Sequence, residues 1–229
     1  MSQSTIQPST FQFLTDLAAN NNRDWFALHK DWYQASLDNM VGFADALLAE
    51  MNKHDLIETP SGKKALFRIY NDVRFSKDKS PYNARFAMSF RRATIERRGG
   101  YYLNLKPGSN FLACGFFNPN PDDLRRIRFD IEDNYEDWHK ILRSKVIKST
   151  YGDMQGNTVA TAPRGYTVDH PGIDLLRHKS FVFRHSFTDD EVLASGFHKS
   201  VSQTFKTIRP WLDYMSEVLT TDRNGELLV

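Results

Sequence analysis

The sequence of 229 residues contains one cysteine, so no disulfide can form within the chain. Cys114 lies in the apolar run FLACGFF, where a buried thiol is expected rather than a nucleophile. No apolar run approaches the roughly 20 residues that a membrane-spanning helix needs, and no apolar leader follows Met1. We therefore expect a soluble, cytoplasmic protein without membrane contact, and we predict no cofactor.

Four fingerprints of established chemistry are also absent. The chain has no Gly-x-x-x-x-Gly-Lys-Ser/Thr, no strand-linked Gly-x-Gly-x-x-Gly, no His-Glu-x-x-His and no Gly-x-Ser-x-Gly. These absences weaken the nucleotide-motor, dinucleotide, zinc-protease and hydrolase hypotheses, because each chemistry requires its residues at those spacings. Whether the protein is an enzyme stays open at this point.

The spacing closest to a metal site is formed by His170, Asp174 and His178. On a helix these positions would share one side, where a divalent ion could bind. His170 precedes a proline, however, and Asp-His-Pro is also an ordinary helix start. We therefore predict no metal site.

Hydrophobic residues make up 40% of the chain and aromatic residues 13%, which is ample for a packed core. The net charge is only +2, but its distribution is uneven. The segment from residue 63 to residue 106 contains twelve cationic and three anionic residues. Its net charge is therefore +9, which leaves a net charge of −7 for the rest of the chain. This basic middle suggests one face that suits an anion, although such a cluster can also be a solvated surface.

Two helices are predicted in the N-terminal part. Apolar residues at helical spacing indicate a first helix over 11–18, with Ser9 or Thr10 as its N-cap and the asparagines 20–22 as its end. A longer helix is predicted over 23–51. Its aromatic stripe is typical of a core face, although the same side chains could line a ligand pocket.

The period then changes from helical to alternating. The run LFRIYNDVRF, residues 66–75, predicts a strand, and the runs RFAMSFR, YYLNLK and FLACGFF predict three more. Glycines between them favour consecutive antiparallel pairing. The side chains of the first strand expected to face the core are Phe67, Ile69, Asn71, Val73 and Phe75. Those expected on its polar face are Arg68, Tyr70, Asp72 and Arg74.

Helical spacing returns at Pro121, with acidic residues at the predicted N-terminus. A short helix with Pro171 in its first turn, a strand over SFVFRHSF and closing helices interrupted at Pro210 complete the chain. The predicted fold is α+β: an antiparallel sheet with helices mainly on one face, an N-terminal helical pair and C-terminal helices. We expect a flexible N-terminus over 1–9, a single domain over 10–219 and a tail over 220–229.

The connection from Ser76 to Ala84 is the feature that points to a binding site. It offers nine residues, whereas a hairpin normally needs about two to five. Loops longer than the connection requires tend to be functional, and this one borders the basic polar face. Arginine forks suit carboxylate or phosphate, and lysine adds a mobile charge. The sequence therefore predicts a site for a small anionic or phosphorylated ligand.

The candidate residues fall into three groups. The predicted ligand-binding residues are Arg68, Tyr70, Asp72, Arg74, Lys77, Lys79 and Arg85. The predicted supporting residues are Ser76, Asp78, Tyr82, His170 and Lys179. In an enzymatic version, Asp72 is the candidate base and Tyr82 or Lys79 the candidate acid.

The run RIYNDVRFSKDKSPYN, together with NNRDWF, GFFNP, LRRIR and APRGYTVDHPGIDLLRHKSF, resembles a widespread and mostly bacterial family of conserved hypothetical proteins with a domain of unknown function. The resemblance extends from about Phe11 to Leu212 and implies no activity. Members often have a lysine after Pro-Tyr, where this chain has Asn83. The resemblance covers the positions Arg68, Tyr70, Asp72, Arg74, Phe75, Ser76, Lys77, Asp78, Lys79, Pro81, Tyr82, Gly165, His170, Pro171 and Lys179.

Two alternatives to a small-ligand site stay open. The basic face could bind nucleic acid or an acidic protein without catalysis, although RRATIERRGG, residues 91–100, contains no aromatic ring to stack a base and reads as a solvated hairpin tip. Alternatively, the cluster could be an internal ionic network in which Arg164, His170 and Lys179 meet the first strand. Sequence does not predict the oligomeric state.

Overall fold

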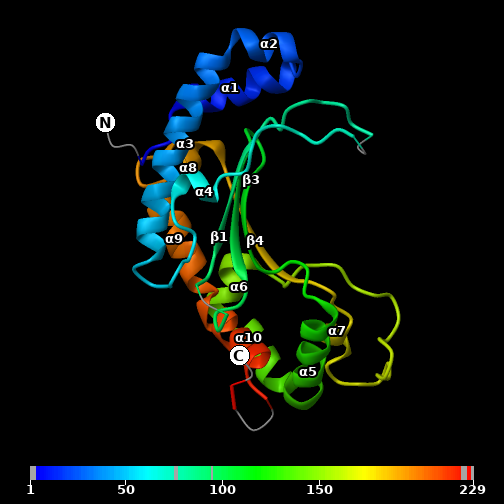
Figure 1. The fold of residues 1–229 in the computed structure, drawn as a ribbon. Helices are drawn as coiled ribbons and strands as arrows, with labels where there is room; N and C mark the ends of the chain where they lie inside the picture. The colour runs from blue at the N-terminus through cyan, green and yellow to red at the C-terminus, as the bar shows by residue number, and fades with distance from the viewer. Residues whose placement is uncertain (1–3, 75–76, 94, 223–225, 228–229) are drawn as a thin grey trace. The chain divides into compact units, whose positions relative to one another are not determined.

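A computed structural model describes residues 4–74, 77–93, 95–222 and 226–227. Its four strands form one antiparallel sheet in the order β1-β2-β3-β4, which confirms the predicted α+β class and the consecutive pairing (Figure 1). No described helix is both long enough and apolar enough to cross a membrane. The strands are β1 (Phe86–Arg91), β2 (Gly100–Leu105), β3 (Asn110–Phe116) and β4 (Phe181–Phe187).

The helices follow the predicted pattern, with differences at their ends. The N-terminal helices are α1 (Pro8–Ala19), α2 (Arg23–Leu28), α3 (Lys30–Met51) and α4 (Gly62–Ala65). The later helices are α5 (Pro121–Leu142), α6 (Lys145–Tyr151), α7 (Ile173–Leu176), α8 (Asp189–Leu193), α9 (Phe197–Thr207) and α10 (Arg209–Thr220).

Three predictions of helix boundaries were wrong. α1 begins at Pro8 with Gln7 as its N-cap, because proline suits the first turn, so neither Ser9 nor Thr10 is the cap. The helix predicted over 23–51 is two helices, separated at His29, whose φ of −113° and ψ of 23° are not helical. α7 begins only after Gly172, so Pro171 precedes the helix rather than lying in its first turn.

The chain groups into two compact units, each built from separate segments. The first comprises Met1–Arg91, Tyr102–Leu112 and Ser186–Gln203, and the second comprises Arg92–Tyr101, Ala113–His185 and Thr204–Val229. The predicted boundaries of a single domain over 10–219 stay a prediction.

The helices of the first unit pack around an aromatic core. The ring of Phe13 on α1 lies 6.4 Å from that of Phe26 on α2 and 5.9 Å from that of Tyr33 on α3. Asn39 on α3 accepts hydrogen bonds from the Thr10 hydroxyl and the backbone N–H of Gln7, both at 2.9 Å. These contacts hold α1 and α2 against α3.

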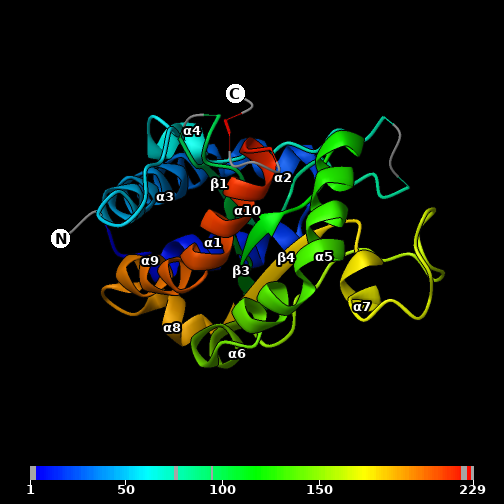
Figure 2. The ribbon, with the colours of Figure 1, turned by 90° about the horizontal axis from the view of Figure 1, so that it is seen from below.

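The second unit has a core of its own. α5 and α10 lie side by side, as both ribbon views show (Figures 1 and 2). The Trp138 ring lies 5.9 Å from Phe181, and the Trp211 ring lies 5.0 Å from Phe183. Both tryptophans are fully buried, so helices and strand share one apolar interior.

The segment from Leu66 to Arg85 forms an arm, the cyan to green hairpin at the upper right of Figure 1. The prediction of a strand over 66–75 was wrong. The described residues of this segment lie outside the named strands, and their antiparallel pairing is limited to the isolated bridges Leu66–Met88 and Tyr70–Tyr82. We call the described residues of this segment, 66–74 and 77–85, the hairpin arm.

Pairing with β1 also decides which side of the sheet Phe67 occupies. Leu66 pairs with Met88, whose side chain is fully buried, so Leu66 takes the core side. The next residue must then face the other way. Phe67 is 55% exposed, and the prediction that it enters the core was wrong. Of the other predicted core residues, Ile69 is buried and Phe75 lies outside the described residues.

Candidate functional site

Tyr82 holds the base of the hairpin arm against the helices of the first unit. Its ring stacks on Phe26, with ring centroids 4.0 Å apart and the rings inclined by 13°. Its backbone N–H donates to the Asn21 side-chain oxygen at 3.1 Å, and its carbonyl accepts from the Asn21 amide at 2.9 Å. Burial raises the pKa of the Tyr82 hydroxyl, so this residue is better placed to anchor the arm than to give up a proton at neutral pH.

Two cations on the outer part of the arm, Arg74 and Lys79, are engaged with the arm itself. Arg74 donates from Nε and Nη2 to the two carboxylate oxygens of Asp72, at 2.9 and 2.7 Å. Lys79 Nζ donates to the carbonyl oxygen of Val73 at 2.9 Å. The Arg74 side chain remains 76% exposed, so this is a surface ion pair of little energetic weight.

The same pair affects the candidate general base. The side-chain and backbone hydrogen bonds from Arg74 lower the pKa of Asp72, and the nearby charge of Arg68 acts in the same direction. A general base works best with a pKa near the operating pH, and a carboxylate with a lowered pKa accepts a proton poorly. The geometry therefore gives no support to Asp72 as a base, and the catalytic assignments stay predictions.

A pocket of about 480 Å³ is lined by residues of the arm, of the end of α1 with the residues that follow it, and of β2, β3 and the turn that joins them. We call it the hairpin pocket. Its carboxamide and hydroxyl groups come from Asn21, Asn71, Ser80, Tyr82, Asn83, Asn104 and Ser109. Its charged side chains are Asp78, Arg85 and Lys106, and its remaining lining residues are Ala18, Ala84 and Phe111.

Arg85 is the most firmly placed cation of the hairpin pocket. Its Nη1 donates to the Asn104 side-chain oxygen at 3.1 Å and to the Tyr102 hydroxyl at 3.3 Å. Asn104 is only 2% exposed, and its own amide donates to the carbonyl of Ser109 at 3.1 Å. The oxygen and the nitrogen of the buried Asn104 amide both have a partner, so the amide fixes the orientation of the Arg85 guanidinium. The remaining nitrogens of Arg85, Nε and Nη2, can donate to a ligand.

Asp78 brings a negative charge to the same pocket. Its carboxylate accepts a hydrogen bond from the backbone N–H of Ser80 at 2.9 Å. The bonds from the backbone and the hydroxyl of Ser80 lower the pKa of Asp78, so the group is ionised at neutral pH. An ionised carboxylate only accepts hydrogen bonds, which suits hydroxyl or amino groups of a ligand.

The structure thus divides the predicted site residues. Asp78, Tyr82 and Arg85 line the hairpin pocket. Ser76 lies outside the described residues. The predicted ligand-binding residues that do not line the pocket are Arg68, Tyr70, Asp72, Arg74, Lys77 and Lys79.

His170 and Lys179 belong to the second unit. His170 Nδ1 accepts a hydrogen bond from the backbone N–H of Gly172 at 3.0 Å, and the Lys179 side chain is exposed. Their predicted role beside the arm stays a prediction, as does the internal ionic network.

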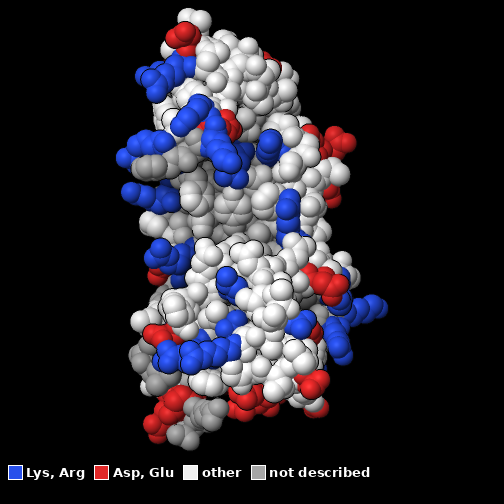
Figure 3. Space-filling view, turned by 90° about the vertical axis from the view of Figure 1, so that its right-hand side faces the viewer, with Lys and Arg blue, Asp and Glu red and all other residues white. Residues whose placement is uncertain are grey.

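Lys and Arg side chains gather on the upper part of the face shown in Figure 3, over the region where Figure 1 draws the hairpin arm. Few carboxylates lie among them. This distribution agrees with the local excess of positive charge in the sequence between residues 63 and 106. An approaching anion would meet a favourable potential here.

Sequence reasoning missed most of the polar lining. Asn21 was assigned to a helix end, and Asn71 was placed with the core side chains. An asparagine among apolar positions was the available signal, because a polar side chain turned toward a core needs partners. Asn71 meets this need through its side-chain amide, which donates to the carbonyl of Ser80 at 3.0 Å.

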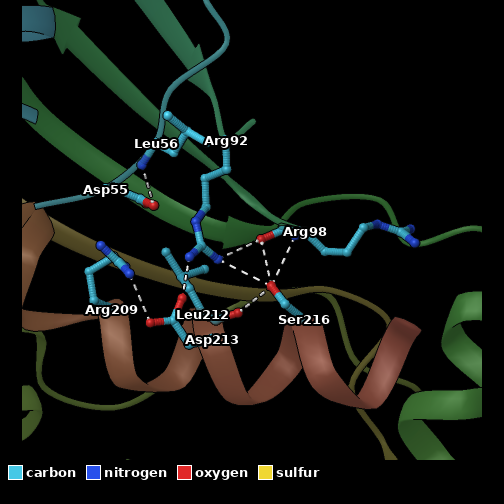
Figure 4. Close-up of polar contacts among 8 residues, drawn as sticks. All are labelled: Asp55, Leu56, Arg92, Arg98, Arg209, Leu212, Asp213 and Ser216. Carbon is cyan, nitrogen blue, oxygen red and sulfur yellow. Dashed lines mark hydrogen bonds and ion pairs between the residues drawn. The ribbon is translucent and has the colours of Figure 1, made fainter. Parts of the chain in front are cut away.

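Arg92 was misplaced at a solvated hairpin tip. Its side chain is fully buried, and its Nη1 donates to the carbonyl of Arg98 at 3.1 Å and to the Ser216 hydroxyl at 3.2 Å (Figure 4). Its Nη2 pairs with Asp213, which also pairs with Arg209. The alternating pattern of β1 could have predicted this burial, because Arg92 continues the series Phe86, Met88 and Phe90 on the core side.

The metal-like spacing does not form a site. α7 has only four residues, so His170 and His178 flank the helix instead of sharing one side of it with Asp174. Within the described part of the chain, no three His, Cys, Asp or Glu side chains lie close enough to hold a metal ion.

Cys114 is buried, as expected. Burial raises the pKa of its thiol to about 12, so almost none of it is thiolate at neutral pH. We expect iodoacetamide at pH 8 to leave the folded protein unmodified and to alkylate Cys114 fully in denaturant, as mass spectrometry would show. Rapid alkylation of the folded protein would contradict a buried thiol.

Comparison with known proteins gives a family but no activity. The model of a family described as "Conserved hypothetical protein (DUF2461)" matches residues 9–214. No curated protein and no solved structure matches the chain. Because the match covers most of the sequence, the chain belongs to the DUF2461 family of conserved hypothetical proteins.

Proposed function

We propose that the hairpin pocket binds a small ligand that carries a phosphate or carboxylate group. The observation that carries this proposal is the guanidinium of Arg85, which Asn104 and Tyr102 orient at the wall of the pocket. Lys106 lines the same pocket and adds a second cation. Arginine recognises phosphate and carboxylate through paired hydrogen bonds, and lysine contributes a mobile charge.

The size and the lining of the pocket support the same proposal. A volume of about 480 Å³ lies within the usual range for small-molecule sites. The carboxamides of Asn21, Asn71 and Asn83 offer donors and acceptors around the cations. By contrast, the Arg74 and Lys79 side chains on the outer arm are engaged with Asp72 and Val73. The pocket is therefore favoured over the outer arm as the place where the anion binds.

Replacing Arg85 with glutamine is expected to weaken ligand binding by at least about tenfold. A hydrogen bond to a charged group contributes roughly 1.5 to 3 kcal/mol, and about 1.4 kcal/mol corresponds to a tenfold change in affinity. Isothermal titration calorimetry with ribose 5-phosphate and with citrate would measure this on the full chain, one probe for each anion class. Binding of either probe also raises the melting temperature, which gives a second readout.

Arg91→Gln is the matched control for this experiment. Arg91 ends β1, whereas Arg85 immediately precedes the strand, and both substitutions remove one charge. The Arg91 side chain is 79% exposed, pairs with Glu58 and does not line the pocket. The proposal requires that Arg91→Gln keeps the affinity of the wild type. Equal weakening by the two substitutions, or failure of the wild type to bind either probe, would count against it.

A further inference from the structure

The solvent side of the sheet beside the hairpin pocket carries a row of aromatic rings. The ring of Phe67 lies 6.1 Å from that of Tyr102, which lies 5.9 Å from that of Phe111. These rings come from the hairpin arm, β2 and β3, three segments separated in sequence. We call these three residues the aromatic row.

The row can form because Ala87, the β1 residue that pairs with Phe67, has a small side chain. Phe67 donates its backbone N–H to the carbonyl of Ala87 on β1 at 2.9 Å. Adjacent strands lie about 4.8 Å apart, so Phe67 and Tyr102 are separated by the width of β1. Ala87 is small enough for the two rings to meet above it, and it is itself only 4% exposed. The small side chain of Ala87 therefore allows the rings of Phe67 and Tyr102 to lie next to each other.

This surface is accessible and adjoins the anion-binding groups. Phe67 is 55% exposed, and Tyr102 is half-buried. Phe111 lines the hairpin pocket together with Arg85 and Lys106. The Tyr102 hydroxyl accepts a hydrogen bond from Arg85, so one residue of the row touches the cation directly. A ligand with an anionic end and a flat aromatic end fits both parts at once.

On this basis, we propose that the ligand of the hairpin pocket is a mononucleotide. Its phosphate would pair with Arg85 and Lys106, and its base would stack on the aromatic row, because every nucleobase has a π-face. The Asp78 carboxylate would accept hydrogen bonds from the ribose hydroxyls, and asparagine amides in the lining match the donor and acceptor pattern of a base edge. This inference rests on the proposed function and names the ligand class for the same site.

The pocket favours a single nucleotide over a nucleic-acid strand. A volume of about 480 Å³ suits one nucleotide. The hairpin pocket also contains the ionised Asp78, which would repel a second phosphate close to the first. A strand would require several cations along a groove, whereas Arg85 and Lys106 are the cations of the pocket lining.

The test compares adenosine 5′-monophosphate (AMP) with ribose 5-phosphate by calorimetry on the full chain. Stacking of a base on an aromatic side chain contributes roughly 1 to 3 kcal/mol, so AMP should bind at least about fivefold more tightly. Tyr102→Leu and Tyr102→Phe both lose the hydroxyl that accepts from Arg85, so any weakening of ribose 5-phosphate binding should be equal in the two variants. Only Tyr102→Leu should also remove most of the preference for AMP. Tyr102→Phe keeps the ring and should keep the preference for AMP.

Two controls separate stacking from a general effect on the fold. Phe117→Leu removes an exposed ring that does not line the pocket and should leave both affinities unchanged. Circular dichroism and thermal melting of each variant show whether it is folded. If Tyr102→Leu does not fold, Phe67→Leu replaces it, because the Phe67 ring is more exposed and its loss should still lower the preference for AMP.

The outcomes distinguish this inference from the proposed function. If ribose 5-phosphate binds as tightly as AMP, the mononucleotide is ruled out and an anion-binding pocket remains. If neither ribose 5-phosphate, AMP nor citrate binds, the proposed function itself fails. If a single-stranded oligoadenylate binds much more tightly than AMP, the site is a strand-binding surface, and the mononucleotide is again ruled out.

Discussion

Replacing Arg92 with alanine is expected to lower the free energy of unfolding by roughly 3 to 5 kcal/mol. The side chain is fully buried and among the largest of the interior. Its loss would open a cavity and remove the donors that serve the carbonyl of Arg98 and the hydroxyl of Ser216. A buried acceptor that loses its donor costs about 1 to 3 kcal/mol.

Urea unfolding followed by circular dichroism would measure this loss. Arg91→Ala is the matched control, because the neighbouring side chain is 79% exposed and pairs only at the surface with Glu58. A surface ion pair contributes at most about 1 kcal/mol. Arg92→Met should fill the cavity and so recover the part of the unfolding free energy that is due to packing, but not the part that is due to the hydrogen bonds. If Arg92→Ala and Arg91→Ala were equally stable, the buried network would have no role in stability.

Gly115→Ala is expected to reduce stability by about 4 kcal/mol or more, enough to lower the yield of folded protein. Gly115 lies in β3 with a φ of +128°, a conformation that side-chain-bearing residues rarely adopt. A Cβ there would overlap the carbonyl oxygen of Phe181 on β4 and lie 3.2 Å from its carbonyl carbon. Phe181 is fully buried, so its backbone cannot yield without moving the core.

Gly108→Ala separates the steric overlap from the cost of positive φ alone. Gly108 has a φ of +75°, and no atom lies within 4 Å of the position that its Cβ would take. A loss of about 1 to 2 kcal/mol is expected from the backbone conformation. Thermal melting of both variants would give the comparison. Similar melting temperatures for the two would mean that β3 and β4 accommodate a side chain at position 115.

The order of the elements followed from local patterns in the sequence. Alternation of Phe86, Met88 and Phe90, and of Tyr101 and Leu103, correctly predicted strands with one buried side. Two acidic residues after Asn120 marked the start of α5, where the Asn120 side chain caps the helix. Such signals depend on neighbours a few residues away, so they can be read along the chain.

The hairpin arm was predicted less well for a physical reason. Alternation over 66–75 is compatible with either side of the sheet, and the bridge of Leu66 to Met88 selects one of them. A shift of one residue exchanges the two faces, which is why Phe67 lies on the solvent side. Farther along the arm, Tyr70 pairs with Tyr82 of the arm itself rather than with a strand of the sheet.

The sequence by itself determined the α+β class, the antiparallel order of the strands and the basic segment that contains Arg85. Only the tertiary structure decided that Arg85, Lys106 and Phe111 line one pocket, that Arg74 turns to Asp72 instead, and that Arg92 is buried. Periodicity reports which side of its own element a residue takes. Which partners it meets there depends on segments far away in sequence, and those partners set its charge, its exposure and its chemistry.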